Sequence, residues 1–239
     1  GKLVKIYTRG EMISMNETNT VAAIMAHPDD EVLGCGGSLA RLSRSGASVH
    51  IFILATGLTS RGPADNASLL ALKDQARSAA DRLGATTIDF ADFPDNAMDS
   101  VKMLDIVKQV ESFLTKTEPD LIFTHHNGDI NIDHDLTQRA VMTATRALPG
   151  SKPFDVLACE VLSSTEFGPA NKRLQPHLYM RLTEDDVKAA IDALVCYEGE
   201  IRDWPHPRSA KALERQLQLR GAECGAEAAE VFEVLRMVC

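Results

Sequence analysis

The sequence predicts an α/β fold of the Rossmann-like, doubly wound kind: a mostly parallel sheet in a single domain, with helices on both faces. Short runs of apolar and β-branched residues alternate along the chain with stretches whose apolar residues recur every three or four positions. The short runs are continuously apolar, as in strands that are buried on both faces of a parallel sheet. Strands and helices in alternation predict right-handed crossovers between parallel strands.

Six continuous apolar runs are the predicted strands of this sheet. Residues that favour turns follow the first three runs: His27-Pro28, then Thr56-Gly57, then the segment 92–95. The fourth run leads directly into His125 and His126. The six runs cover residues 21–26, 49–55, 86–90, 121–124, 156–162 and 177–182.

Amphipathic stretches between these runs are the predicted helices, over residues 33–45, 67–83, 101–117, 136–148 and 187–195. Gly84 directly after the second stretch predicts the end of that helix. Thr183 before the last stretch predicts an N-cap, with Asp186 in the first turn. The glycines of Gly34-Cys35-Gly36-Gly37 do not fit a dinucleotide-binding loop, because that pattern requires a small residue where Leu39 stands. We expect them to let the first helix pack close to the sheet.

No internal repeat and no linker rich in Gly or Ser divides the chain, so we expect one domain over residues 20–239. The first residue is glycine, and residues 1–19 are expected to be an N-terminal extension, part of it foreign to the native protein, with Met12 or Met15 as native start. Residues 197–239, interrupted by Trp204-Pro205-His206-Pro207, are expected to form a mostly helical appendage.

The composition excludes several classes of protein. The 25 basic and 34 acidic residues give a net charge of −9, which argues against a partner nucleic acid or an anionic membrane surface. Aromatic residues make up 5% of the chain, too few for a broad stacking surface. No run approaches the roughly 18 apolar residues of a membrane span. Five scattered cysteines without a Cys-x-x-Cys pair, and the lack of an export signal, predict reduced thiols and a cytoplasmic location.

Polar residues capable of chemistry follow the first predicted strand. In such a sheet, ligands bind in the crevice at the carboxyl ends of the strands. The sequence there is Ala26-His27-Pro28-Asp29-Asp30-Glu31. A protein core would not select three carboxylates in a row, because unpaired buried carboxylates cost several kcal/mol each. His27 and Asp30 are spaced to converge on one cation, with Asp29 beside them as a base. The alternative is that the acidic residues only stabilise the start of the following helix.

A second polar cluster follows the fourth predicted strand. Three of the seven histidines and three aspartates lie between His125 and Asp135. One ligand from this cluster would complete a His/Asp/His set that leaves a coordination position open for water, as catalytic zinc sites do. Zinc lowers the pKa of its water and polarises a carbonyl, while a nearby carboxylate takes up the proton. The alternative is a solvated polar loop, but the matched positions of the two clusters favour a metal site.

Together these motifs resemble a known family. The strand followed by Ala-His-Pro-Asp-Asp-Glu, the glycines at 36 and 37 and the Asn-x-Asp-His at 131–134 resemble the LmbE-like, or PIG-L, zinc-dependent N-deacetylases. The resemblance covers the chain from about residue 21 to the C-terminus. Residues 160–166 and 206–209 resemble, more loosely, a bacterial branch of the family that is associated with amino sugars and surface polysaccharides.

The resemblance implies roles for individual residues. It implies that His27, Asp30 and His134 hold the metal, expected to be Zn²⁺, with other divalent transition metals as alternatives. It implies that Asp29 acts first as general base and then as the acid that protonates the leaving amine. Many family members stabilise the oxyanion with a histidine at the position where this chain has Asn131.

Further roles implied by the resemblance carry alternatives. An asparagine brings no positive charge to an oxyanion, so His126, His125 or a histidine from a partner subunit are alternatives for that role. Asp133 is expected to orient its neighbours. The candidate substrate contacts are Asp95, Arg61 and Glu166, with Arg208 as a second candidate for binding an anionic group of the substrate. For the arginines the alternative is a surface position, and for Glu166 it is a helix cap.

The sequence therefore predicts a metal-dependent hydrolase that removes the N-acetyl group from an N-acetylated amino sugar or its conjugate. Two alternatives stay open. One is a metal-dependent hydratase or lyase that acts on an unsaturated keto acid. The other is a non-catalytic metal- or ligand-binding relative, suggested by Asn131. The expected partner is a small-molecule N-acetylated sugar, and a homo-oligomer is expected.

Overall fold

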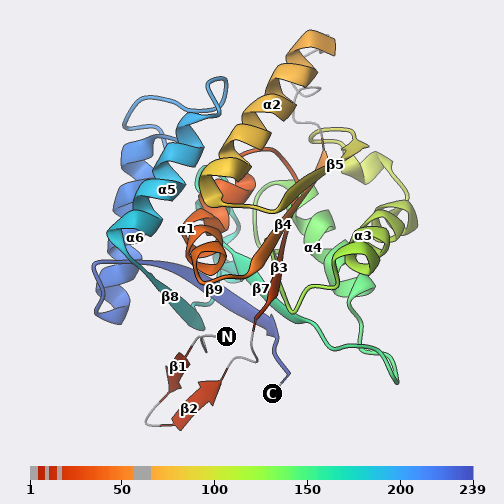
Figure 1. Cartoon of the computed structure of the whole chain (residues 1–239). Coiled ribbons are helices and arrows are strands. Elements are labelled where there is room, and N and C mark those ends of the chain that lie inside the picture. Colours follow the sequence, from red (N-terminus) through yellow and green to blue (C-terminus); the bar gives the residue numbers. More distant parts are fainter. Residues whose placement is uncertain (1–4, 9–10, 15–17, 56–65, 239) are drawn as a thin grey trace.

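A seven-stranded sheet in the order β5-β4-β3-β6-β7-β9-β8 forms the centre of the molecule (Figure 1). The computed structural model describes residues 5–8, 11–14, 18–55 and 66–238. The strands are β3 (Thr20–Met25), β4 (Ser48–Ala55), β5 (Thr87–Phe93), β6 (Leu121–His125), β7 (Asp155–Cys159), β8 (Leu178–Leu182) and β9 (Ala228–Arg236). Strands β3 to β7 pair in parallel, whereas β9 is antiparallel to both β7 and β8. The predicted mostly parallel α/β sheet is confirmed.

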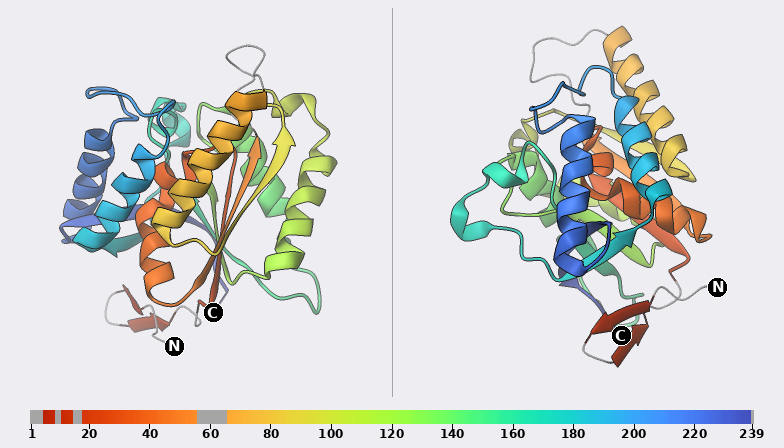
Figure 2. Two further views of the ribbon diagram at one scale, coloured as in Figure 1. Left: turned by 45° about the horizontal axis from the view of Figure 1, so that its top comes forward. Right: turned by 90° about the vertical axis from the view of Figure 1, so that its left-hand side faces the viewer.

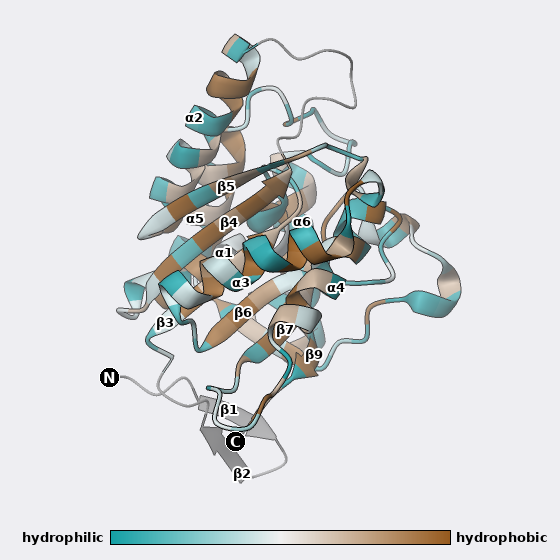
Figure 3. Ribbon diagram, turned by 90° about the vertical axis from the view of Figure 1, so that its right-hand side faces the viewer, coloured by the Kyte–Doolittle hydropathy of each residue, from teal (hydrophilic) through white to brown (hydrophobic). Residues whose placement is uncertain are grey.

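Helices cover both faces of this sheet (Figures 1 and 2). They are α1 (Asp30–Arg44), α2 (Asn66–Leu83), α3 (Met103–Thr117), α4 (Ile132–Ala144), α5 (Glu184–Val195) and α6 (Ala210–Cys224). Alternate residues of β3 face opposite sides: Ala23 packs in the core under α1, α2, α5 and α6, and Ala22 in the core under α3 and α4. Figure 3 shows the inner strands β4 and β6 as mostly hydrophobic, whereas β5 at the edge of the sheet alternates between hydrophilic and hydrophobic residues. The continuous apolar runs of the sequence therefore contribute side chains to two hydrophobic cores, one on each face of the sheet.

Local signals in the sequence explain where several helices begin and end. α2 ends at Leu83, and Gly84 adopts a positive φ of 72°. Thr183 and Asp186 form a reciprocal capping box at the start of α5, in which each side chain accepts the backbone N–H of the other residue. Both predictions are confirmed.

Helix α1 lies unusually close to the sheet. A Cβ added to Gly34 would lie 2.5 Å from Cys159 Sγ, and one added to Gly37 would lie 2.5 Å from Leu182 Cδ1. Larger residues would push α1 away from the sheet, so the expectation that these glycines serve close packing is confirmed. The helix is interrupted at Cys35, whose φ and ψ of −151° and 17° are not helical. Just after the interruption, the carboxylate of Glu230 in β9 accepts the N–H groups of Gly37 (2.8 Å) and of the residue after it (2.7 Å).

The C-terminal part of the chain differs from the expectation. A mostly helical appendage over residues 197–239 was expected, but only α6 is helical there, and β9 is inserted into the sheet between β7 and β8. Glu227, Glu230 and Glu233 recur every third position, which imitates an amphipathic helix and hides the strand. In the sheet, Glu230 contacts α1 and Glu233 pairs with β7, and both partners are distant in sequence.

A second, small sheet lies outside the central one. Strands β1 (Lys5–Thr8) and β2 (Glu11–Ser14) form a separate antiparallel pair within the expected N-terminal extension.

Among the described residues, no helix is both long enough and hydrophobic enough to cross a membrane.

The order of strands places a crevice between β3 and β6. From β3 the chain proceeds to β4 and β5 on one side, and it then returns to β6 and β7 on the other side. In open α/β sheets, ligands bind at the carboxyl ends of the strands where the strand order reverses in this way. The loop after β3 carries residues 27–29 and the loop after β6 carries residues 126–131, so both polar clusters lie at this point.

Replacing Glu230 by alanine is expected to destabilise the protein by roughly 1–3 kcal/mol, because it removes a buried acceptor from two backbone N–H groups of α1. Urea-induced unfolding measures this change. Glu227 lies three residues away on the same segment and is exposed, so Glu227→Ala is the matched control, with a change within about 0.5 kcal/mol. Equal losses in the two variants would contradict this role.

Glu230 also predicts a pH dependence of stability. Burial raises the pKa of Glu230 from 4.5 to about 7, although the backbone N–H groups oppose the shift. The folded protein therefore holds the proton more tightly than the unfolded chain, and the stability that this group contributes is lost as pH rises through about 7. The unfolding free energy of the wild type relative to Glu230→Gln should fall by about 2 kcal/mol between about pH 5 and about pH 8. A constant difference over this range would contradict the assignment.

Candidate metal centre

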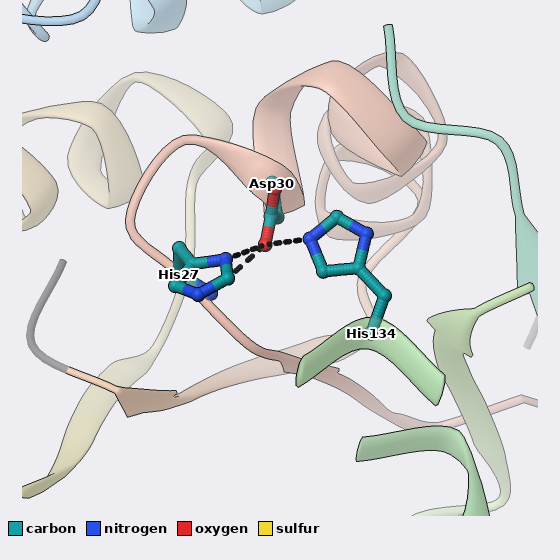
Figure 4. A group of neighbouring side chains, drawn as sticks. All are labelled: His27, Asp30 and His134. Atoms are coloured by element: carbon teal, nitrogen blue, oxygen red, sulfur yellow. Dashed lines mark hydrogen bonds and ion pairs between the residues drawn. The ribbon is translucent and has the colours of Figure 1, made fainter. Parts of the chain in front are cut away.

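Two histidines and an aspartate converge at the carboxyl ends of β3 and β6 (Figure 4). One potential ligand atom from each of His27, Asp30 and His134 lies within 4.8 Å of the other two. Oδ2 of Asp30 is 3.3 Å from His27 Nδ1 and 3.2 Å from His134 Nε2. All three side chains are buried. The structure thus brings together the three residues that the sequence assigns to the metal.

A carboxylate lies behind each of the two histidines. Asp133 Oδ2 is 3.0 Å from His27 Nε2, and Asp129 Oδ2 is 3.0 Å from His134 Nδ1. Each contact leaves the other ring nitrogen directed towards Asp30. Histidines that ligate metals are commonly oriented in this way, with a carboxylate on the second nitrogen.

The two supporting carboxylates are themselves held by neighbouring loops. Asp133 accepts the backbone N–H groups of Asn96 at 2.7 Å and Met98 at 3.0 Å, which agrees with its expected orienting role. Asp129 accepts the hydroxyl groups of Ser164 and, at 2.7 Å, Thr165, which lie in the loop after β7. The loops after β5, β6 and β7 therefore together fix the orientation of the two imidazoles.

The charges at this site suit a cation. Despite burial, which lowers it, the pKa of His27 rises to about 10 because of Asp133 and Asp30. In the same way, Asp30 and Asp129 raise the pKa of His134 to about 9. These raised pKa values reflect the negative charge of the buried carboxylates around the two histidines.

A divalent cation would replace the two protons that this charge attracts. Oδ1 of Asp30 is buried without a hydrogen-bond partner among the described residues, so one ligand oxygen is free. Two imidazoles and one carboxylate are a known donor set of catalytic zinc sites. The residues present therefore fit a divalent transition metal.

Asp29 lies beside this group with a free carboxylate. It is 1% exposed, and neither of its carboxylate oxygens has a hydrogen-bond partner among the described residues. Burial raises its pKa well above the usual range, while the guanidinium of Arg208, 3.4 Å from Oδ2, opposes the rise. Asp29 precedes α1, but its side chain makes no capping hydrogen bond. The side chain of Asp29 therefore does not cap the helix, whereas Asp30 and Glu31 lie in its first turn, as the alternative expects.

The groups considered for oxyanion stabilisation have other partners. The side chain of Asn131 caps α4 by accepting the N–H of Asp133, and its Nδ2 donates to Asn96 Oδ1 at 2.9 Å. These bonds occupy one of the two N–H groups of that amide. The ring nitrogens of His126 lie 2.8 Å from Glu233 Oε2 and 2.7 Å from a backbone carbonyl, which speaks against a role for this residue. His125 Nε2 accepts a backbone N–H, and burial lowers its pKa to about 3.

The predicted substrate contacts differ in position. Asp95 is buried at the site, with Oδ1 3.3 Å from His27 Nε2. Glu166 accepts the backbone N–H groups of Ser163 (2.7 Å) and of the next residue (3.0 Å), so the structure favours its capping alternative. Arg61 lies outside the described residues.

Two contributions to the site were not anticipated from the sequence. Asp129 belongs to the second polar cluster, but nothing in the pattern indicated that it, rather than Asp135, supports His134. Arg208 was considered as an anion-binding residue or as a surface residue, yet it contacts Asp29. No spacing rule links residues in loops so far apart along the chain.

Comparisons with known proteins find a family and relatives that this chain resembles. The model of a family described as PIG-L, GlcNAc-PI de-N-acetylase, matches residues 22–145. The uncharacterised deacetylase YaiS of Escherichia coli K12 is 29% identical over 150 residues, which are 61% of this chain and 78% of YaiS. The 4-oxalmesaconate hydratase of Pseudomonas putida is 26% identical over 225 residues, 87% of this chain and 84% of the hydratase.

A solved structure supports the fold. The N,N'-diacetylchitobiose deacetylase from Pyrococcus horikoshii superposes with a TM-score of 0.74 over 92% of this chain and 84% of its own, at 18% identity. At that identity the likeness concerns the fold alone.

The metal assignment predicts graded losses of affinity. Purified wild-type protein should bind about one equivalent of zinc, and His134→Ala should abolish binding, since it removes one of three ligands. Asp129→Asn should weaken binding by about 10–100-fold, because it leaves His134 less firmly oriented. Competition with a chromogenic chelator measures both effects. Asp99→Asn, an exposed aspartate in the loop before α3, is the control and should bind zinc as the wild type does. Wild-type affinity in Asp129→Asn would contradict the support role.

Proposed function

The chain belongs to the PIG-L family, and on this premise we propose that it is a metal-dependent hydrolase that removes the N-acetyl group from an N-acetylated amino sugar or its conjugate. Family membership and the deacetylase relative support metal-dependent deacetylation in general. The amino sugar is our proposal, supported by the family description and by the chitobiose substrate of the structural neighbour.

One observation carries the proposal: Asp29, the neighbour of a ligand in a buried His/Asp/His group, has a buried carboxylate that accepts no hydrogen bond among the described residues. His27, Asp30 and His134 would hold the ion, which we propose to be Zn²⁺. A purely structural metal site has no use for a second buried carboxylate next to its ligands, held by an arginine and without a hydrogen bond, such as that of Asp29. An amide hydrolase does, because a proton must leave the attacking water and another must reach the departing nitrogen.

The roles of the residues follow from their positions. When bound, the cation supplies Lewis acidity, which activates water and polarises the amide carbonyl. Asp29 takes the proton that the water releases on attack at the carbonyl carbon. Asp29 then gives this proton to the amide nitrogen as the carbon–nitrogen bond breaks, so that acetate and a free amine leave. Its raised pKa suits a group that must both accept and return a proton.

Two further residues are proposed to act on the substrate. The remaining N–H of Asn131 is the candidate donor to the oxyanion, although the amide adds no positive charge. Asp95, buried next to His27, is the candidate acceptor for a sugar hydroxyl. The chain has few aromatic residues, which suits a site that holds one small sugar by hydrogen bonds.

A hydratase is the second candidate. The hydratase relative matches 87% of this chain, against 61% for the deacetylase relative. The same Asp29 and the same ligands would then serve the addition of water to the double bond of an unsaturated keto acid. The non-catalytic alternative is weaker, because it leaves the buried carboxylate of Asp29 without a purpose.

The cellular location and the oligomeric state of the protein are also proposals. Cys35, Cys159, Cys196 and Cys224 are free thiols in the described part of the chain, in keeping with a reducing cytoplasmic location. A homo-oligomer is part of the same proposal.

Asp29→Asn is expected to lower the rate of amine release by about 10²–10⁴-fold while zinc content stays unchanged, because proton transfer is lost and the ligands remain. Asparagine is the suitable replacement, since Asp29 has a positive φ of 95°, which asparagine tolerates. A fluorogenic amine assay with N-acetylglucosamine and N,N'-diacetylchitobiose measures the rate.

Asp135→Asn is the matched control. Asp135 follows His134 directly, but it pairs with Arg139 on the outside of α4. Its rate should equal that of the wild type. A full rate in Asp29→Asn would overturn the mechanism. If wild-type protein hydrates unsaturated keto acids and releases no amine from the acetylated sugars, the hydratase is the correct function.

A further inference from the structure

We propose that the segment between α5 and α6, residues 197–208, positions Asp29, and that Arg208 is the positioning residue that aims its carboxylate. The proposal rests on the proposed function, in which Asp29 handles protons. The segment lies outside residues 22–145, the part of the chain that matches the family model. The segment therefore contributes to the site residues that lie outside the motif.

Arg208 connects Asp29 to two other side chains. Its Nη1 lies 3.4 Å from Asp29 Oδ2 and 3.1 Å from Glu200 Oε2. Its Nε donates to Ser163 Oγ at 2.7 Å. Ser163 follows β7 and Glu200 follows α5, so the guanidinium is held by two segments that are separate along the chain. The planar, rigid donor geometry of arginine allows it to be fixed by two partners while it faces a third.

The same segment also supports the backbone of Asp29. The N–H of Asp29 donates to Glu31 Oε2 at 3.2 Å, and Tyr197 donates its hydroxyl to Glu31 Oε1 at 2.5 Å. Glu31 and Tyr197 are completely buried. Asp29 has a φ of 95°, a region that residues other than glycine occupy only when their surroundings hold them there. Tyr197 thus acts on the main chain of Asp29 through Glu31, and Arg208 acts on its side chain.

These contacts argue against the other role considered for Arg208, which was to bind an anionic group of the substrate. Two carboxylates, Asp29 and Glu200, already lie against its guanidinium, and a third partner takes its Nε. An arginine that is neutralised in this way has little attraction left for an anion. Asp29, in contrast, has no hydrogen bond to its carboxylate among the described residues, so the charge of Arg208 is what orients it.

The contact can be tested without any substrate. Arg208→Met leaves the carboxylate of Asp29 buried without its countercharge, and the midpoint of thermal unfolding should fall by about 5–10 °C. Asp29→Asn removes that charge, so the double variant should recover at least half of this fall. Arg44 is the matched control, because it too pairs with a completely buried aspartate, Asp186, far from the site. The fall caused by Arg44→Met should be the same with Asp29 or with asparagine at that position. Additive shifts for Arg208→Met and Asp29→Asn would overturn the proposal.

The consequence for catalysis is tested on the zinc-loaded protein with N,N'-diacetylchitobiose. Arg208→Met should lower kcat by about 10–100-fold, with KM within about twofold and zinc content unchanged, because a misaimed base slows the chemical step alone. Arg208→Lys keeps the charge and should recover part of kcat, whereas Arg44→Met should leave kcat at the wild-type value. An unchanged kcat, or a rise in KM at constant kcat, would overturn the positioning role. If wild-type protein releases no amine, the proposed function fails, and the unfolding midpoints still decide whether Arg208 holds Asp29.

Discussion

The burial of several carboxylates in one crevice is the constraint on which the rest of the site depends. Each buried charge requires a partner, because an unpaired one costs several kcal/mol. Here Asp133 and Asp129 are matched by imidazoles and by donors from neighbouring loops, and Asp29 is matched by Arg208. Asp30 stands between both histidines. Since every group serves as partner to another, the geometry of the metal ligands and that of the base are set together.

The parts of the fold and of the site that depend on local pattern were predictable from the sequence. Continuous apolar runs, the glycine after α2 and the capping threonine of α5 each act within a few residues. The place of the candidate metal site was predictable because two parallel strands that end in polar clusters must bring those clusters to one edge of the sheet, whereas the choice of His134 as third ligand came from the resemblance to the family. Arg208 and Glu230 act across the chain on Asp29 and Gly37. No periodicity carries such pairings, because they arise only when the tertiary fold is complete.

The relatives show why fold and metal ligands alone do not distinguish the two candidate reactions. Proteins named as a deacetylase and as a hydratase both match this chain. Both reactions require an activated water and a base, which the motif residues could supply in either case. The difference must therefore lie in the groups that meet the remainder of the substrate, such as Asn131 and Asp95, and in where the carboxylate of Asp29 is aimed.

The position of β9 has a consequence for how the protein acquires its shape during synthesis. β9 is the last strand along the chain, yet it lies between β7 and β8, and its Glu230 reaches a helix 193 positions earlier. While the chain is still emerging from the ribosome, β7 and β8 cannot be joined, and α1 lacks its acceptor. Pairings between distant segments slow folding, because a long loop must close before any contact rewards it. The nascent protein therefore exposes unpaired strand edges until β9 has been synthesised, and during that interval it is open to aggregation and to chaperones.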